Sequence, residues 1–172
     1  AEEARLIEAA CRAAGATQVL RAATEDERRE LWRVRRELSP AIKTIATMKV
    51  NQDVVVPRGR VPELFRLVGE LKREFGVAIP CFGHAGDGNI HVNVMVDASD
   101  PDAVRRAHAA QRRLFEGVVG LEGSISGEHG IGYTKAPFLA LELSREAIAL
   151  MKRVKQAFDP HGILNPGKIF ED

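Results

Sequence analysis

The sequence predicts an α+β fold of the ferredoxin-like type, in which helices cover one face of a four-stranded antiparallel sheet and a helical extension follows. The main observation is that short Val- and Ile-rich segments alternate with single amphipathic helices. In addition, a wide, glycine-containing turn joins segments 77–82 and 89–96, which favours an antiparallel, hairpin-like pair. We therefore expect a single domain over residues 1–172.

The elements expected in the first half of the chain each have the period of a helix or a strand and a residue that starts or stops them. They are helices at 2–14, 24–38 and 60–75, and strands at 18–22 and 53–57. Thr24 and Glu27 have the spacing of a capping box, which starts a helix. Gly15 and Gly76 follow the last periodic residues of two of these helices and are expected to end them.

The second half contains strands 77–82 and 89–96, followed by two further helices. Asp100 and Pro101 are suited to the start of a long helix that reaches about Gly120. Ser144 is expected to cap the last helix. The apolar residues of that helix are predicted to face inward: Ile148, Met151, Val154 and Phe158.

Composition narrows the function classes. A hydrophobic content of 45% and a charged content of 28% are typical of a globular protein. The formal net charge of +1 gives no basis for binding nucleic acid. No apolar run approaches the ~18 residues that cross a bilayer. The two cysteines, Cys11 and Cys81, form no CxxC pair, so we expect reduced thiols and a cytoplasmic protein.

The start of the chain, Ala-Glu-Glu-Ala, is acidic and unlike a signal peptide. It also lacks an initiator Met. We therefore expect the chain to be part of a longer protein.

The segment 81–97 is the most informative part of the sequence. Its glycines allow a sharp turn and a close approach to a ligand. From Asn89 onward, apolar residues alternate with a polar side that carries His91 and Asn93. Because these side chains coordinate or hydrogen-bond, the polar side is predicted to be the open, ligand-binding face of the sheet. Asp87, in the turn, is more typical of a turn former than of a ligand.

A second glycine-rich segment, 124–135, holds Glu128 and His129 next to each other. Together with His84 and His91 they offer imidazoles and a carboxylate. Two His and one carboxylate bind Zn²⁺ or a similar divalent ion and leave a position open for substrate. The alternative is a pair of polar segments that only satisfy backbone groups and make surface ion pairs.

Three motifs occur in order along the chain: GHAGDGNIH at 83–91, SGEHGIG at 126–132 and FDPHGILNPGK at 158–168. Together they resemble the C-terminal domain of FAD-linked oxidases, the group of the glycolate oxidase FAD-linked subunit, D-lactate dehydrogenase and D-2-hydroxyglutarate dehydrogenase. The resemblance implies a cap that closes a substrate pocket over the flavin of a 2-hydroxy-acid dehydrogenase. The resemblance also implies that FAD is held mainly by an absent N-terminal domain. In keeping with this, the chain has no GxGxxG after a strand.

The resemblance also implies residue roles and partners. His84, His91 and Glu128 match metal ligands, and His129 matches the base that takes the hydroxyl proton. The positions that meet substrate or cofactor are Arg35, Ser39, Lys49 and Asn93 for the substrate, and Asn165 for the flavin. The implied partners are a small 2-hydroxy acid, the protein's own FAD domain and other oxidase subunits, through which it would be peripheral to a membrane.

The expected reaction oxidises a 2-hydroxy acid to a 2-oxo acid. A divalent ion would lower the pKa of the substrate hydroxyl, and an imidazole accepts a proton near neutral pH. The sequence leaves open whether the ion is Zn, Mn or Fe, and which 2-hydroxy acid is used. Two other functions remain open at this point: a freestanding metal-dependent hydrolase, and a non-catalytic module that binds a partner.

Overall fold

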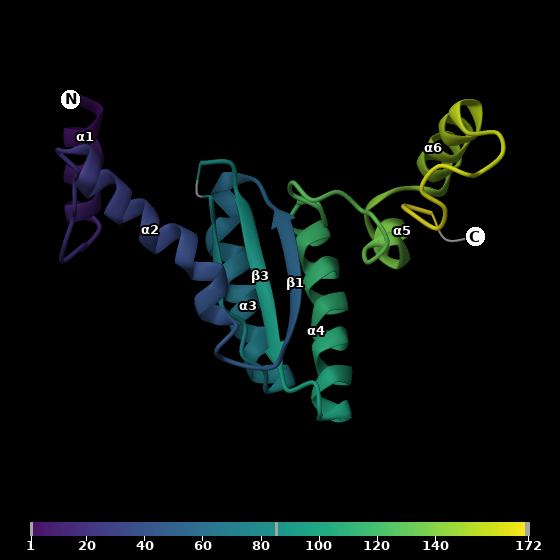
Figure 1. The fold of residues 1–172 in the computed structure, drawn as a ribbon, viewed down its shortest axis with the longest axis horizontal. Helices are drawn as coiled ribbons and strands as arrows, with labels where there is room; N and C mark the ends of the chain where they lie inside the picture. Colours follow the sequence, from purple (N-terminus) through teal and green to yellow (C-terminus); the bar gives the residue numbers. More distant parts are fainter. Residues whose placement is uncertain (1, 85, 171–172) are drawn as a thin grey trace. The chain divides into compact units, whose positions relative to one another are not determined.

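The computed structural model describes residues 2–84 and 86–170. The chain divides into two compact units, Ala1–Ala41 and Ile42–Asp172, each of which is described by itself. The fold is α+β, as predicted, and the sheet lies in the second unit (Figure 1).

The first unit contains helix α1, Glu2–Ala13, and all but the last residue of helix α2, Glu25–Ile42. The predicted capping box is present: the Glu27 N–H donates to Thr24 Oγ1 at 3.2 Å, and the Thr24 N–H donates to Glu27 Oε2 at 3.2 Å. The predicted strand at 18–22 is wrong, because these residues pair with no other strand.

The sheet of the second unit has three strands: β1, Met48–Val55; β2, Cys81–His84; and β3, Asn89–Val96. β3 is antiparallel to both neighbours and lies between them, in the order β1-β3-β2. Helix α3, Val61–Phe75, connects the two outer strands. A β-α-β unit split by an inserted strand is the ferredoxin-like arrangement.

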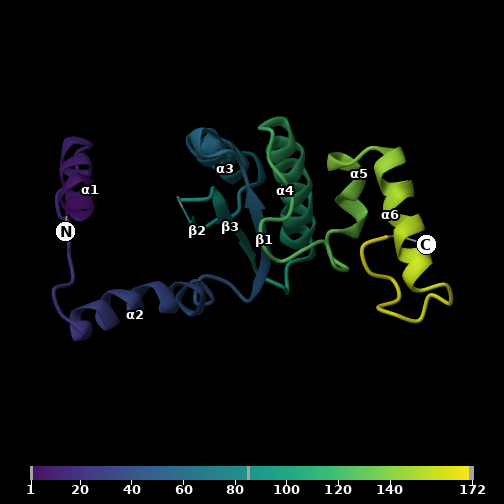
Figure 2. The same ribbon diagram turned by 90° about the horizontal axis from the view of Figure 1, so that it is seen from above.

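Two helices cover one face of this sheet (Figure 2). They are α3, preceded by the short 3₁₀ helix η1 at Arg58–Arg60, and α4, Pro101–Gly120. The core between them and the sheet includes Ile90, Val92 and Val94 from β3 and Leu114 and Phe115 from α4. Burial of the whole core cluster supplies most of the hydrophobic stabilisation of the fold.

The ends of these helices are as predicted. Asp100 caps α4 by accepting hydrogen bonds from the N–H groups of Asp102 and Ala103, at 2.9 and 3.1 Å. Gly76 ends α3 in the left-handed region, at φ 62°.

The prediction of four strands is wrong for the part of the chain that the structure describes, because the strand expected at 18–22 is absent; a single bridge, which the sequence did not predict, extends the three-stranded sheet. Ser124 pairs with Val55 on the outer edge of β1, with N···O distances of 2.8 and 3.1 Å. The Gly127 N–H then donates to the Asp53 carbonyl at 3.2 Å, and no longer ladder forms. The segment 124–135 is too rich in glycine and turns to continue as a strand.

The polar side of β3 is not the open face that the alternation suggested, because every residue of β3 is buried. The register places Asp53 opposite His91 and Asn51 opposite Asn93, so these four side chains share the face away from α3 and α4. Segment 124–135 covers Asp53 and His91: its Lys135 contacts Asp53, and its Glu128 contacts His91.

The C-terminal extension consists of the short helices η2, Ala136–Phe138, and α5, Leu139–Glu142, and of helix α6, Arg145–Phe158. Ser144 caps α6 as predicted, accepting the Ala147 N–H at 3.2 Å. The prediction that the apolar residues of α6 face inward is wrong: α6 has no buried residue, and Val154 and Phe158 are 53% and 82% exposed.

Candidate functional site

Three candidate metal ligands come together from three segments of the chain. His84 ends β2, His91 lies in the middle of β3, and Glu128 lies in segment 124–135. One ligand atom from each residue lies within 4.8 Å of the other two. His91 Nε2 is 3.4 Å from Glu128 Oε1. Two imidazoles and a carboxylate at this spacing fit a divalent ion such as zinc, with a coordination position left over.

The pairing of β2 with β3 explains why the two histidines meet. Asn89 is the cross-strand partner of His84, and it lies two residues before His91 on the same face. The two rings have centroids 6.1 Å apart and are nearly perpendicular, at 72°. The spacing His-x₆-His therefore becomes a diagonal pair on one face of the sheet.

The turn between the histidines is held by the protein's own backbone. Gly88 has φ 80°, and a Cβ at this position would lie 2.1 Å from the Val56 carbonyl oxygen. Asp87 Oδ1 accepts the Asn89 N–H at 2.9 Å, as expected of a turn former. At Gly88, therefore, glycine is required by the packing of the turn against Val56, the residue that follows β1.

His91 is in the protonation state that binds metals. Burial lowers the pKa of His91; Glu128 raises it, and the neighbouring His129 lowers it again. The pKa remains below the ordinary value for histidine, so the imidazole is neutral near neutral pH. A neutral imidazole has a free lone pair for an ion.

His129 lies beside this cluster. Its ring centroid is 5.7 Å from that of His91, and its Nε2 is 3.8 Å from Glu128 Oε1. Its side chain is 51% exposed, whereas that of His91 is only 9% exposed. The ring can therefore meet a small molecule bound at the cluster.

Asp53 and Lys135 form a buried ion pair beneath these residues, which the sequence reasoning did not identify. Lys135 Nζ lies 2.5 Å from Asp53 Oδ1 and donates to the Asp53 carbonyl oxygen at 3.0 Å. Asp53 Oδ2 accepts the N–H groups of Glu128 and His129 at 2.6 and 2.9 Å. These contacts fix the segment that carries Glu128 and His129. The available signal was a carboxylate inside a Val-rich strand, where charge is unfavourable without a partner.

Asn93 is fully buried on the same face of β3. Its Nδ2 donates to the carbonyl oxygens of Pro80 and His91, at 3.2 and 3.4 Å. Its Oδ1 has no hydrogen-bond partner among the described residues. A buried acceptor without a partner is uncommon and suits a ligand's donor.

The other predicted site residues lie on α2, on β1 and in the C-terminal tail. Arg35 and Ser39 are on α2, in the first unit. Lys49 is on β1, opposite Met95, and lines a separate cavity. Asn165 is in the C-terminal tail, has φ 49°, and lines a hollow of about 340 Å³ next to α6.

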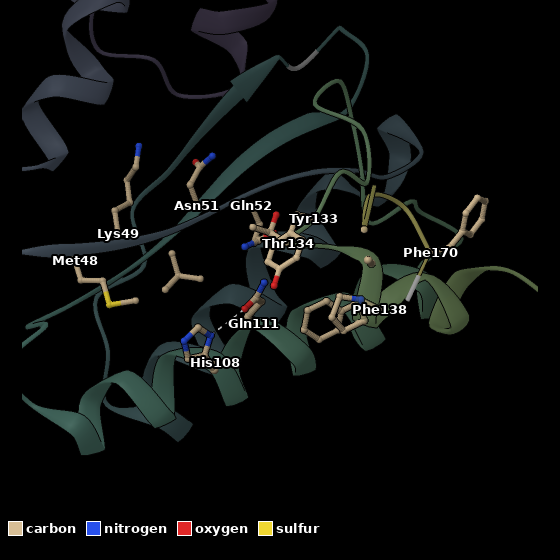
Figure 3. A pocket seen from close by; sticks show the side chains of 14 residues that line it. Met48, Lys49, Asn51, Gln52, His108, Gln111, Tyr133, Thr134, Phe138 and Phe170 are labelled. Atoms are coloured by element: carbon tan, nitrogen blue, oxygen red, sulfur yellow. Dashed lines mark hydrogen bonds between the residues drawn. The ribbon is translucent and has the colours of Figure 1, made fainter. Parts of the chain in front are cut away.

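The separate cavity, of about 910 Å³, lies along the outer edge of β1 (Figure 3). Lys49, Asn51 and Gln52 of β1 border it, with Gln111 of α4 and Phe138. Gln52 Oε1 is buried and has no hydrogen-bond partner in the described part of the chain.

Comparison with known proteins identifies the family of this chain. The family described as FAD linked oxidases, C-terminal domain, matches residues 1–169, and the chain belongs to this family. The glycolate oxidase subunit GlcD of Bacillus subtilis is 38% identical over 164 residues, which are 95% of this chain and 35% of that protein.

Two further relatives carry other names. A D-2-hydroxyglutarate dehydrogenase of Stutzerimonas stutzeri is 40% identical over 153 residues, covering 86% of this chain and 32% of that protein. A D-lactate dehydrogenase of Anaerostipes hadrus is 36% identical over 157 residues, covering 91% of this chain and 33% of that protein. The chain thus spans about a third of the length of these curated relatives.

As for membranes, no helix in the described residues combines the length and the apolar character that crossing a bilayer requires.

Proposed function

We propose that this chain is the substrate- and metal-binding cap of a FAD-dependent oxidoreductase that converts a 2-hydroxy acid to a 2-oxo acid. The observation that carries the proposal is the convergence of His84, His91 and Glu128 beside His129. Relatives named for glycolate, D-lactate and D-2-hydroxyglutarate oxidation support this substrate class. All three acids have a hydroxyl next to a carboxylate.

In this proposal His84, His91 and Glu128 hold a divalent ion. When bound, the ion supplies Lewis acidity to the carboxylate and hydroxyl of the substrate. His129 takes the hydroxyl proton, and Asn93 Oδ1 accepts a hydrogen bond at the same face. Lys49 contributes a donor to the substrate carboxylate.

The flavin would be held mainly by the part of the protein that corresponds to the remaining two thirds of the relatives. On this chain, α6 and the tail suit an interface with that part. Phe158 and Ile163 are 82% and 73% exposed, and single-domain proteins seldom leave neighbouring large apolar side chains uncovered. Asn165 lies in the same tail and would approach the cofactor.

The experiment is a calorimetric titration of the chain with Zn²⁺ and with Mn²⁺, in the absence and presence of D-lactate. We expect binding at one site, and tighter binding with D-lactate, because its carboxylate and hydroxyl chelate the ion. His84→Ala and Glu128→Gln should each weaken binding at least about tenfold, since even the loss of a residue that only supports a ligand costs that much.

His108→Ala is the matched control, because His108 lies on the exposed side of α4, away from the cluster. Its affinity should equal that of the wild type. Unchanged affinity in both ligand variants would refute the metal site. Hydrolysis of ester substrates by the chain alone, abolished by the same substitutions, would instead identify a freestanding hydrolase.

A further inference from the structure

Asp53 has more hydrogen-bond contacts than an isolated structural carboxylate needs, and the proposed reaction gives it no role. It is fully buried in β1 and lies directly opposite His91 in the register. Its two oxygens have different partners. Oδ2 accepts the backbone N–H groups of Glu128 and His129, and Oδ1 is contacted by Lys135 Nζ.

The second contact of Oδ1 is with the ring of His129. Oδ1 lies 3.3 Å from His129 Nδ1. The two oxygens of an ionised carboxylate are equivalent, so while one binds the two backbone N–H groups the other faces the ring. An ionised carboxylate oxygen only accepts hydrogen bonds.

We propose that Asp53 is a positioning residue for His129, which it holds in the tautomer that carries the proton on Nδ1. Nε2 is then left unprotonated, and it lies on the side of Glu128, 3.8 Å from Oε1. The inference rests on the proposed function, in which His129 is the base.

Lys135 keeps Asp53 in the form that this role requires. Both side chains are buried, with 5% and 0% exposure, so the ammonium is the nearest compensation for the buried carboxylate. It also donates to the Asp53 carbonyl oxygen at 3.0 Å, which fixes the backbone of β1 at this residue. A neutral Asp53 could offer a proton to Nδ1 and reverse the tautomer.

The tautomer determines whether His129 can act. With Nδ1 protonated, the Nε2 lone pair accepts the hydroxyl proton: the O–H bond breaks, its electron pair stays on oxygen, and an N–H bond forms. The resulting imidazolium lies beside the Asp53 carboxylate, which stabilises it. With Nε2 protonated, the ring would instead direct a donor toward Glu128 and have no lone pair on that side.

The test reads the tautomer directly from the ¹⁵N shifts of the His129 ring in the labelled chain. Spectra are recorded in alkaline buffer, in which imidazoles are neutral. For the wild type we expect the proton on Nδ1. In Asp53→Asn the amide oxygen stays with the two backbone N–H groups, so the NH₂ group faces the ring. The major tautomer should then reverse to Nε2–H.

Asn51→Ala is the matched control, because Asn51 lies on the same strand and the same face, two residues earlier. It should keep the wild-type tautomer. If the introduced amide and the Lys135 ammonium, both donors, prevent folding of the single variant, Asp53→Asn combined with Lys135→Met removes that conflict.

A wild-type ring with its proton mainly on Nε2 overturns the inference without any variant, and so does an unchanged tautomer in a folded Asp53→Asn chain. The spectra need neither metal nor substrate. Failure of this inference is therefore distinct from failure of the proposed function, which the metal titration tests.

Discussion

Asp53 shows how one residue can determine the arrangement of a site without contacting a ligand. Its contacts reach Glu128, His129 and Lys135, which are 75 to 82 positions away in the sequence. The sequence predicts His84, His91 and Glu128 together because each lies in a glycine-rich motif with metal-ligand chemistry. It does not indicate Asp53 in the same way, because the partners of a buried carboxylate become visible only after folding.

The same residue leads to a prediction about acid stability. Burial alone would raise the pKa of Asp53, but Lys135 and the N–H groups of Glu128 and His129 lower it from 3.8 to about 2. The pKa of Asp53 is lower in the folded state than in the unfolded state. The stabilisation of the fold by this carboxylate is therefore complete above about pH 4 and is lost as the pH falls toward 2. We expect this group to contribute about 2 kcal/mol to the free energy of unfolding.

Urea unfolding between neutral pH and pH 2 measures this contribution. The wild type should lose it across that interval, whereas Asp53→Asn should be less stable at neutral pH and show a flatter acid dependence. Asn51→Ala should keep the wild-type slope. Parallel curves for the wild type and Asp53→Asn would show that the carboxylate is not stabilised by its neighbours.

At the scale of elements, the bridge of Ser124 to β1 and the Gly127 hydrogen bond to Asp53 bring the segment with Glu128 and His129 to the sheet. Alternating apolar residues were sufficient to predict β3, and the helices at 60–75 and 101–120 were predicted almost to the residue. The bridge of Ser124 to β1 was not predicted, because glycines and side-chain contacts take the place of a regular ladder at 124–127. Strand 18–22 was predicted from local composition, but a strand also needs a partner.

Gly123 tests how closely this segment must approach β1. A Cβ at Gly123 would lie 2.4 Å from the Val55 carbonyl oxygen, immediately before the bridge formed by Ser124. We expect Gly123→Ala to lower the free energy of unfolding by about 1–3 kcal/mol, because the backbone must shift. Denaturant unfolding measures the loss. Gly59→Ala, which has no atom within 4 Å of the added Cβ, is the control. Equal stability of the two variants would contradict the close packing.

For the whole molecule, the hydrophobic core belongs to the second unit. The buried cluster extends from Val50 to Ile125, and it includes no residue of α1 or of the first unit. The α+β class was predictable because alternating strands and helices are visible along the chain. The exposure of α6 was not, because an apolar period shows that a face is apolar and does not show what covers it.

Because the core is confined in this way, residues 42–172 should fold without the first unit. We expect cooperative thermal unfolding of this piece and the same Zn²⁺ affinity as the whole chain, since His84, His91 and Glu128 are all retained. Circular dichroism and calorimetry measure both properties. Non-cooperative unfolding of the piece would show that α1 and α2 are needed for the fold.

The central position of β3 in the sheet has one more consequence, which concerns the register of strand pairing. A slip of one residue in its pairing would carry the His91 imidazole into the layer occupied by Leu114 and Phe115, and would place Val92 on the polar side, which Asp53 shares. The packing of the apolar side of β3 therefore also fixes the register of its polar side, which carries His91. Misalignment that would scatter the imidazoles is opposed by the same free energy that keeps the protein folded.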